Sequence, residues 1–136
     1  MRVLGLMSGT SADGIDAVLV QLSGKLNRPK WKVLNTSSIS YPLDVKNIIL
    51  KVSQGEKLNT FEWLDLEDAI TECHAEVALN CDPYRSFELV GCHGQTVCHR
   101  PPSNQGIGSS LQIIRAPLLA QFLGCPVVYN FRDADL

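Results

Sequence analysis

Residues 2–22 read Arg2-Val-Leu-Gly-Leu-Met-Ser-Gly-Thr-Ser-Ala-Asp-Gly-Ile-Asp-Ala-Val-Leu-Val-Gln-Leu22. Two apolar runs, over residues 2–7 and 15–22, flank a centre of small and polar residues. Short runs rich in Val, Leu and Ile favour strands, and the Gly, Ser and Asp between them favour a turn. The stretch therefore predicts a strand, a polar glycine loop and a second strand.

A third strand is expected over residues 31–41. Trp31 and Val33 alternate with polar residues, and Ile39 and Tyr41 resume the alternation farther on, as in a half-buried strand. Residues 24–27 supply a turn before it. The N-terminal part of the chain thus predicts a three-stranded antiparallel meander.

Two helices are expected after Pro42. The apolar residues of the first recur at helical spacing up to Gly55, which is placed to end it: Val45, Ile48, Ile49 and Val52. For the second, Asn59 and Glu62 have the spacing of a capping box, and Leu58 and Trp63 that of a hydrophobic staple. Its apolar face continues through Leu66, Ile70, Cys73 and Val77.

The rest of the chain predicts a strand over residues 87–92, a loop over 103–108, a short extended piece over 111–114 and a strand over 126–129. A helix is expected between Pro117 and Gly124. Three antiparallel strands, helices, a strand, a helix and a strand form the ribonuclease-H-like order used by actin, hexokinase and chaperone ATPases. We therefore expect residues 1–136 to be one α/β domain with a mixed sheet, an antiparallel meander and flanking helices.

Composition and charge narrow the function classes. The 136 residues have a formal net charge of −2 at pH 7 without basic runs, which argues against a nucleic-acid-binding protein. The apolar runs are too short for a signal sequence or a membrane span. Five cysteines, an odd number in apolar surroundings, fit reduced thiols better than a disulfide framework. We expect a cytoplasmic protein with small-molecule partners, and neither nucleic-acid nor membrane partners.

The loop between the first two strands has the residue types of a phosphate site. Backbone N–H groups of Gly9, Thr10 and Ser11 are candidates for a nest around phosphate oxygens, and Asp13 or Asp16 for holding Mg²⁺ through water. The alternative is a simple hairpin turn, because Asp-Gly is among the strongest turn signals. The loop is neither a Walker A motif nor a G-x-G-x-x-G fingerprint, so the residues alone leave the ligand open.

A second polar segment, Gly91-Cys-His-Gly-Gln-Thr-Val-Cys-His-Arg-Pro101, follows the strand expected over residues 87–92. Open α/β sheets place ligand-binding loops after such strands. Its candidate donors and acceptors for a hydroxylated or anionic ligand are His93, Gln95, Thr96, His99 and Arg100. The alternative is a polar loop whose side chains bond to their neighbours.

A zinc site is a weaker hypothesis. Thiolate and imidazole side chains occur at Cys73-His74, Cys81, Cys92-His93 and Cys98-His99. The sequence has no C-x-x-C pair, and Cys73 lies on the apolar face of its helix. Buried thiols without a metal are therefore expected.

Three segments resemble one enzyme family. The opening signature of anhydro-N-acetylmuramic acid kinases resembles Gly5-Leu-Met-Ser-Gly-Thr-Ser-Ala-Asp-Gly-Ile-Asp16, with Ala12 where a larger apolar residue is common. The family's second signature resembles Gly91-Cys-His-Gly-Gln-Thr-Val97 with His99-Arg-Pro101. Its third segment is similar to Leu111-Gln-Ile113, Pro126-Val-Val128 and Phe131-Arg132. The motifs are collinear and span the whole chain.

The resemblance implies a two-domain, actin-like kinase of cell-wall recycling that binds ATP and Mg²⁺. Its reaction converts 1,6-anhydro-N-acetylmuramic acid and water into N-acetylmuramate 6-phosphate. The phosphate loop would be Gly9, Thr10, Ser11, Ala12, Asp13, Gly14, Ile15 and Asp16, with Asp13 and Asp16 near the metal. The residues near the sugar would be His93, Gln95 and Thr96. The resemblance leaves open a homodimer of the full-length enzyme.

The chain also departs from the family pattern. Ile114-Arg115 stands where the family usually has Gly-Asp, and Asn130 where it usually has Asp. The resemblance places the catalytic aspartate, a second phosphate loop and the adenosine site beyond Leu136, so a C-terminal domain is expected to be absent and the isolated chain inactive. The alternative is a catalytically incompetent fragment that binds nucleotide or phosphate weakly at most. A different kinase of the same superfold is a more distant third hypothesis.

Overall fold

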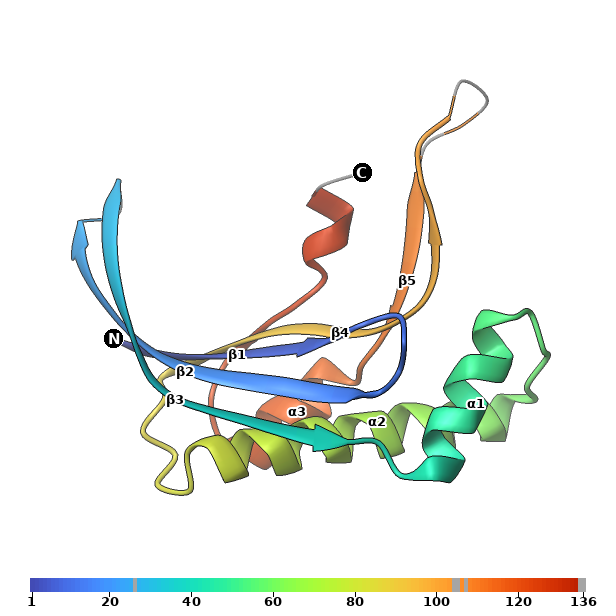
Figure 1. The fold of residues 1–136 in the computed structure, drawn as a ribbon, viewed down its shortest axis with the longest axis horizontal. Coiled ribbons are helices and arrows are strands. Elements are labelled where there is room, and N and C mark those ends of the chain that lie inside the picture. The colour runs from blue at the N-terminus through green and yellow to red at the C-terminus, as the bar shows by residue number, and fades with distance from the viewer. Residues whose placement is uncertain (26, 104–105, 107, 135–136) are drawn as a thin grey trace.

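The computed structural model describes residues 1–25, 27–103, 106 and 108–134 (Figure 1). In chain order the elements are β1 (Arg2–Ser8), β2 (Gly14–Lys25), β3 (Arg28–Ser40), α1 (Leu43–Ser53), α2 (Thr60–Cys81), β4 (Leu89–Arg100), β5 (Ser109–Ile113), α3 (Ala116–Leu123), β6 (Val127–Val128) and the 3₁₀ helix η1 (Phe131–Ala134).

In the described part of the chain the strands form one mixed sheet of six. Its order is β3-β2-β1-β4-β5, and β6 pairs with β4. The meander of β1, β2 and β3 is antiparallel, and β1 pairs in parallel with β4. β5 runs antiparallel to β4, whereas β6, which follows α3, runs parallel to it. The order and directions confirm the ribonuclease-H-like α/β class expected from the sequence.

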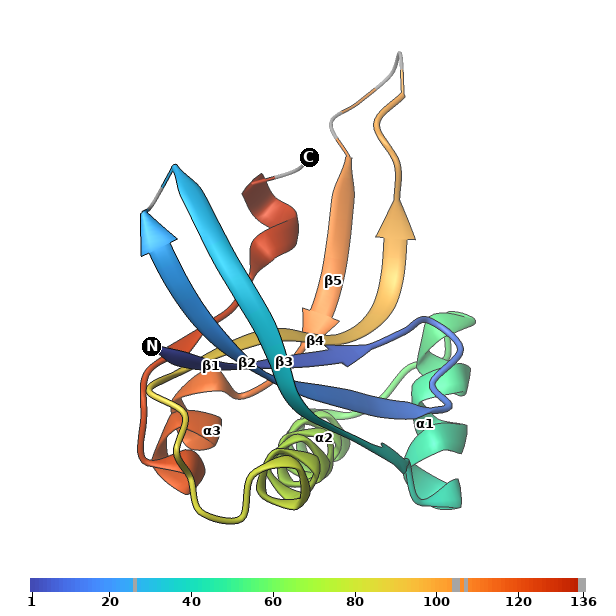
Figure 2. The ribbon, with the colours of Figure 1, turned by 60° about the vertical axis from the view of Figure 1, so that its left-hand side comes forward.

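The described helices α1, α2 and α3 lie against the same face of the sheet (Figures 1 and 2). The core fills the space between this face and the helices, and its most buried apolar side chains are Leu4, Ile15, Ile49, Ile70, Val77, Val90 and Leu119. Because side chains alternate along a strand, the intervening residues point to the opposite face. Within the described residues that face carries no α-helix, and the β2–β3 and β4–β5 ribbons curl up on either side of it (Figure 1).

The helix ends follow the expected signals. The Asn59 side chain accepts hydrogen bonds from Phe61 N and Glu62 N, and Glu62 accepts one from Asn59 N, which confirms the capping box. α3 ends at Gly124, whose φ of 71° is the left-handed conformation that glycine tolerates best. No described helix is long and apolar enough to cross a membrane.

The third strand forms where it was expected, but most of it is not half-buried. Trp31 is 69% exposed and Val33 is 45% exposed, because β3 is the edge strand and extends past the helices. Only its C-terminal end approaches the core, where Ile39 is partly buried and Tyr41, just after the strand, is buried. Alternation predicted the strand correctly and its burial incorrectly.

The strand expected to end at residue 92 continues to Arg100 as β4. Residues 93–100, expected as a loop, belong to this strand, because β5 pairs with the part from Gln95 to Arg100. In the loop expected over residues 103–108, Ser103 and Gly106 form an isolated bridge, and residues 104, 105 and 107 lie outside the described part. The helical turn η1 was not predicted.

Candidate functional site

The first candidate segment is a tight turn that joins two antiparallel strands, as predicted. Ser8 of β1 pairs with Ile15 of β2, and Gly9 O accepts a hydrogen bond from Ala12 N at 3.2 Å. Ala12 has a φ of 53° and a buried side chain. Because its N–H is already bonded within the turn, Ala12 offers no amide donor to a ligand.

The turn itself is shorter than the expected phosphate loop, since Gly14, Ile15 and Asp16 belong to β2. The side chain of Ile15 is buried in the core. A Cβ atom on Gly14 would lie 2.0 Å from Ile39 O, so glycine is required there by strand packing. A Cβ atom on Gly9 would meet only Ser11 Oγ, at 3.9 Å, so at Gly9 the backbone is open to a ligand.

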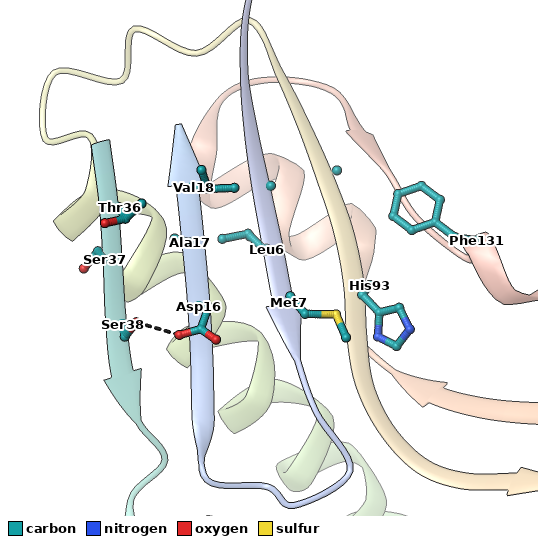
Figure 3. Close-up of a pocket in the computed structure, with 12 residues that line it drawn as sticks. Leu6, Met7, Asp16, Ala17, Val18, Thr36, Ser37, Ser38, His93 and Phe131 are labelled. Carbon is teal, nitrogen blue, oxygen red and sulfur yellow. Dashed lines mark hydrogen bonds between the residues drawn. The ribbon is translucent and has the colours of Figure 1, made fainter. Parts of the chain in front are cut away.

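Both expected metal-binding carboxylates reach the outside of the hairpin. Asp13 Oδ1 accepts a hydrogen bond from Lys46 Nζ at 2.6 Å. That bond, with a second one from Ser11, lowers the pKa of Asp13. Asp16 Oδ1 accepts a hydrogen bond from Ser38 Oγ at 2.6 Å (Figure 3). Asp13 is therefore a charged, exposed group at neutral pH.

Two hollows meet at Asp16. One, of about 560 Å³, lies along the turn and is lined by polar residues that include Gly9, Ser11 and Asp13. The other, of about 590 Å³, lies over the helix-free face of the sheet and is mostly apolar (Figure 3). Its lining residues include Gly5, Met7, Val18, Gly91, His93 and Phe131. Asp16, Met7 and Ser38 line both hollows, so an anionic group on the turn would lie beside a ligand on the sheet.

His93 faces the apolar hollow from β4 (Figure 3). Its Nδ1 lies 3.0 Å from Gly94 O, and a carbonyl only accepts, so Nδ1 carries the proton. Arg132 Nε donates to Nε2 at 3.3 Å. The two bonds together favour the neutral Nδ1–H tautomer and hold the ring at the wall of the hollow.

Gln95 and Thr96, the other two residues expected near a sugar, are buried in this chain. Gln95 Nε2 donates to Gly9 O at 2.8 Å and to Thr96 O at 2.9 Å. Thr96 Oγ1 accepts from Gln112 Nε2 at 3.3 Å. Of the three residues, His93 alone lines the hollows described here. His99 and Arg100 are exposed near the end of β4.

Two of the three departures from the family pattern, Ile114 and Asn130, lie beside His93. Ile114 and Asn130 line a small cavity of about 190 Å³ on which His93 also borders. The guanidinium of Arg115 is paired with Asp68 on α2, which raises the pKa of Arg115. Asn130 has a φ of 63°, which Asn tolerates better than most residues, and its Nδ2 donates to Asp133 Oδ2 at 2.6 Å. The charge that Arg115 introduces is thus balanced by Asp68.

Sequence reasoning did not identify Lys46, Ser38 or Phe131 as site residues. Lys46 and Ser38 hold the two carboxylates from α1 and β3, and Phe131 stands over Gly91, where an added Cβ would lie 3.6 Å from its ring. The signal for Phe131 was its place in the third segment of the resemblance. A surface lysine and a strand serine carry no comparable signal.

The residues at the turn fit a magnesium ion held mainly through water. Mg²⁺ commonly keeps several waters and takes one or two carboxylates together with phosphate oxygens. Asp13 and Asp16 are carboxylates on one hollow, beside the Ser11 hydroxyl. Within the described residues, no group of three or more His, Cys, Asp or Glu side chains is placed to hold a metal. The arrangement thus suits a water-held ion with phosphate and lacks a dedicated protein cage.

Comparison with known proteins agrees with the motifs. The family model described as anhydro-N-acetylmuramic acid kinase matches residues 1–136. The chain is 58% identical over 136 residues to an anhydro-N-acetylmuramic acid kinase of Prochlorococcus marinus (strain MIT 9313), and 52% identical over 141 residues to one of Synechococcus sp. (strain CC9311). All of this chain is covered, but only 36% and 37% of those relatives. Among solved structures, that of Thermus thermophilus RuvC matches with a TM-score of 0.47 and 17% identity, over 96% of this chain and 63% of that one.

Proposed function

The chain belongs to the anhydro-N-acetylmuramic acid kinase family, and from that premise we propose that it forms the N-terminal, phosphate-binding part of an ATP-dependent sugar kinase. The substrate is 1,6-anhydro-N-acetylmuramic acid. Water adds to the anomeric carbon, the 1,6-anhydro bridge opens, and the freed O6 takes the γ-phosphoryl group of ATP, which leaves as ADP, to give N-acetylmuramate 6-phosphate. This reaction belongs to peptidoglycan recycling in the cytoplasm.

One observation carries the proposal: the polar hollow at the turn and the apolar hollow on the sheet meet at Asp16. Phosphoryl transfer depends on placing the phosphate and its acceptor side by side. The open backbone at Gly9 and the Ser11 hydroxyl suit phosphate oxygens, and the apolar hollow with His93 at its wall suits a sugar ring.

Asp13 and Asp16 would hold Mg²⁺ through water, and the ion would neutralise phosphate charge during transfer. Lys46 donates a hydrogen bond to Asp13 and lowers the pKa of that carboxyl. His93, held as the neutral tautomer by Gly94 and Arg132, offers a ring edge to the sugar. The chain spans 36% of the length of its relatives, and we assign the base that activates water to the part that it does not span.

A second candidate is a catalytically incompetent fragment that binds nucleotide or phosphate weakly. The observation that favours it is the helix-free face of the sheet, because no α-helix of the described chain covers either hollow. A single wall cannot exclude water or aim charge from two sides at the transferred group.

A chimera separates the two candidates. Residues 1–136 replace the matched segment of the Prochlorococcus marinus (strain MIT 9313) kinase, and N-acetylmuramate 6-phosphate is measured by mass spectrometry after incubation with ATP, Mg²⁺ and the anhydro sugar. We expect the chimera to retain activity and Asp16→Asn to lower its kcat/KM at least about 100-fold, a loss within the range for charge-stabilising groups. Asp65→Asn, an exposed carboxylate on α2, is the matched control.

The isolated 136-residue chain is expected to form no product above background. A folded but inactive chimera beside an active parent enzyme would support the incompetent fragment. Multiple turnovers by the isolated chain would show that the general base has been misplaced.

A further inference from the structure

Two reciprocal hydrogen bonds join the turn after β1 to the middle of β4. Ser8 Oγ donates to Gly94 O at 2.9 Å, and Gln95 Nε2 donates to Gly9 O at 2.8 Å. Each bond links residues 86 positions apart in the chain. Ser8 and Gln95 are both buried, so neither bond competes with solvent at its side-chain end.

A β-bulge in β4 turns the Gln95 side chain inward. Leu6 pairs with Cys92 but Ser8 pairs with Gln95, so two residues of β4 stand opposite Met7. The extra residue shifts the alternation, and Gln95 points into the core, as Cys92 does, with no exposed surface.

Gly94 permits this bulge. Its φ is 75°, and a Cβ atom there would lie 3.2 Å from both Ile113 O and Ile114 Cγ2. Glycine avoids both the backbone strain and the crowding. The direction of the Gln95 amide is therefore built into the backbone of β4.

The bond to Gly9 O sets the orientation of the following peptide group. Gly9 O accepts from both Gln95 Nε2 and Ala12 N. In a planar trans peptide the C=O of one residue and the N–H of the next point in opposite directions. With Gly9 O held toward the buried amide, the N–H of Thr10 is directed away from the core, to the solvent side of the turn.

We propose that Gln95 is a positioning residue for phosphate binding: it holds the Gly9 carbonyl inward and thereby presents the Thr10 N–H to a phosphate oxygen. This inference rests on the proposed function of the turn as the nucleotide-phosphate site. Gln95 Oε1 has no hydrogen-bond partner among the described residues. Burying this unpaired oxygen costs stability, and a methionine would fill the same space without that cost. The contribution of the Gln95 amide therefore lies in the shape that it gives to the turn.

Hydrogen exchange of the 136-residue chain, followed by NMR, tests the positioning directly. Gln95→Met is compared with Gln21→Met, because Gln21 Nε2 also donates to two backbone carbonyls, those of Met1 and Leu22. We expect the Ala12 amide to exchange at least ten times faster in Gln95→Met, with core amides such as Leu6 unchanged, and no change at Ala12 in Gln21→Met. Unchanged exchange at Ala12, or acceleration shared equally by Leu6, would overturn the proposal.

A measurement on the unmodified chain covers the case in which Gln95→Met does not fold. The Nε2 protons of Gln95 are expected to exchange with water at least ten times more slowly than those of Gln21. Equal rates would show that the Gln95 amide does not hold the turn.

Steady-state kinetics of the chimera connects the positioning to phosphate binding. Gln95→Met is expected to raise KM for ATP at least tenfold and KM for the anhydro sugar less than threefold. Equal increases in both, or an unchanged KM for ATP despite a loosened turn, would overturn the positioning role and leave the proposed kinase intact. An inactive unmodified chimera would instead count against the proposed function, and hydrogen exchange would then decide whether Gln95 holds the turn.

Discussion

Gly9 and Gly14 lie in the same hairpin and are glycines for different reasons. Gly14→Ala places a Cβ atom 2.0 Å from Ile39 O, which forces β2 and β3 apart. We expect a loss of about 3 kcal/mol or more in the free energy of unfolding, at the upper end for overpacking. Gly9→Ala, with only Ser11 Oγ at 3.9 Å, should cost less than about 1 kcal/mol. Urea unfolding of both variants measures the difference, and equal losses would show that the strands are not packed as described.

His74 is a fully buried titratable side chain that the site does not use. Its Nδ1–H donates to Ile70 O at 2.8 Å, and its Nε2 has no partner among the described residues. Burial lowers the pKa of His74 from 6.5 to about 4. The folded chain therefore keeps His74 neutral under conditions in which the unfolded chain protonates it.

This difference predicts acid sensitivity. Below pH 6.5 His74 is protonated in the unfolded chain, whereas in the folded chain it stays neutral down to about pH 4. The free energy of unfolding should accordingly fall as the pH is lowered from 6.5 to about 4, and His74 contributes up to about 3 kcal/mol of this loss. Urea unfolding at several pH values measures how steeply the free energy of unfolding falls with decreasing pH. This dependence should be weaker in His74→Gln and retained in His99→Gln, whose ring is exposed. The same slope in all three proteins would assign the acid sensitivity to other groups.

The Asp13–Lys46 pair makes a separate prediction at the turn. Lys46→Met removes the group that lowers the pKa of Asp13 most, so that pKa should rise toward its ordinary value of 3.8. Lys51→Met changes a lysine of α1 that lies near Glu56 and should leave Asp13 unaffected. Carboxyl NMR titration measures both. A pKa of Asp13 that is the same in both variants would mean that Lys46 does not hold this carboxylate in solution.

At the scale of elements, the start of α2 depends on one side chain. Asn59→Ala removes the acceptor for Phe61 N and Glu62 N and should cost about 1 to 2 kcal/mol in the free energy of unfolding. Asn47→Ala replaces an exposed residue within α1 and should be neutral or slightly stabilising, because Ala is the better helix former. Thermal and urea unfolding compare the two; equal effects would contradict the capping role.

Local signals predicted the elements that depend on local chemistry. The capping box at Asn59 and the glycine after α3 each act within a few residues, and both formed as expected. The length of β4 depends on pairing with β5, which alternation within residues 93–100 does not reveal. The exposure of β3 depends on how far the helices reach across the sheet. Both misjudged features are therefore set by tertiary neighbours.

The candidate site was predicted to a similar depth. The turn after β1 was predicted from residue type alone, since small polar residues between two apolar runs are visible in sequence. Asp13, in the turn, and Asp16, in β2, were named only as candidates for a metal. The inward turn of Gln95 was not, because a bulge at Gly94 shifts the alternation that sequence reasoning assumes. Whether His93 contacts sugar and whether Asp13 and Asp16 hold Mg²⁺ remain predictions.

At the scale of the whole molecule, the five cysteines, all within the described residues, are free thiols. Their reactivity can therefore show where and when the fold opens. Cys73, Cys81 and Cys92 are buried, and Cys98 is exposed. Burial raises the pKa of Cys92 to about 11, so little of the reactive thiolate is present at neutral pH. A thiol reagent should modify Cys98 first and the three buried thiols only as the chain unfolds. Mass spectrometry of labelled peptides checks the order, and early labelling of Cys92 would show that the core opens locally.

The parallel pairing of β1 with β4 also has a consequence for the order of events during synthesis. The meander joins neighbours in sequence, whereas contacts such as Gln95 to Gly9 span 86 residues. Closing that separation costs roughly 2 kcal/mol more in loop entropy than closing the first hairpin. Until β4 leaves the ribosome, β1 has one edge unpaired and the Gly9 carbonyl lacks its buried donor. A nascent chain can therefore hold a formed β1–β2 hairpin whose Gly9 carbonyl is not yet held inward, and the proposed shape of the turn is reached only after β4 has paired with β1.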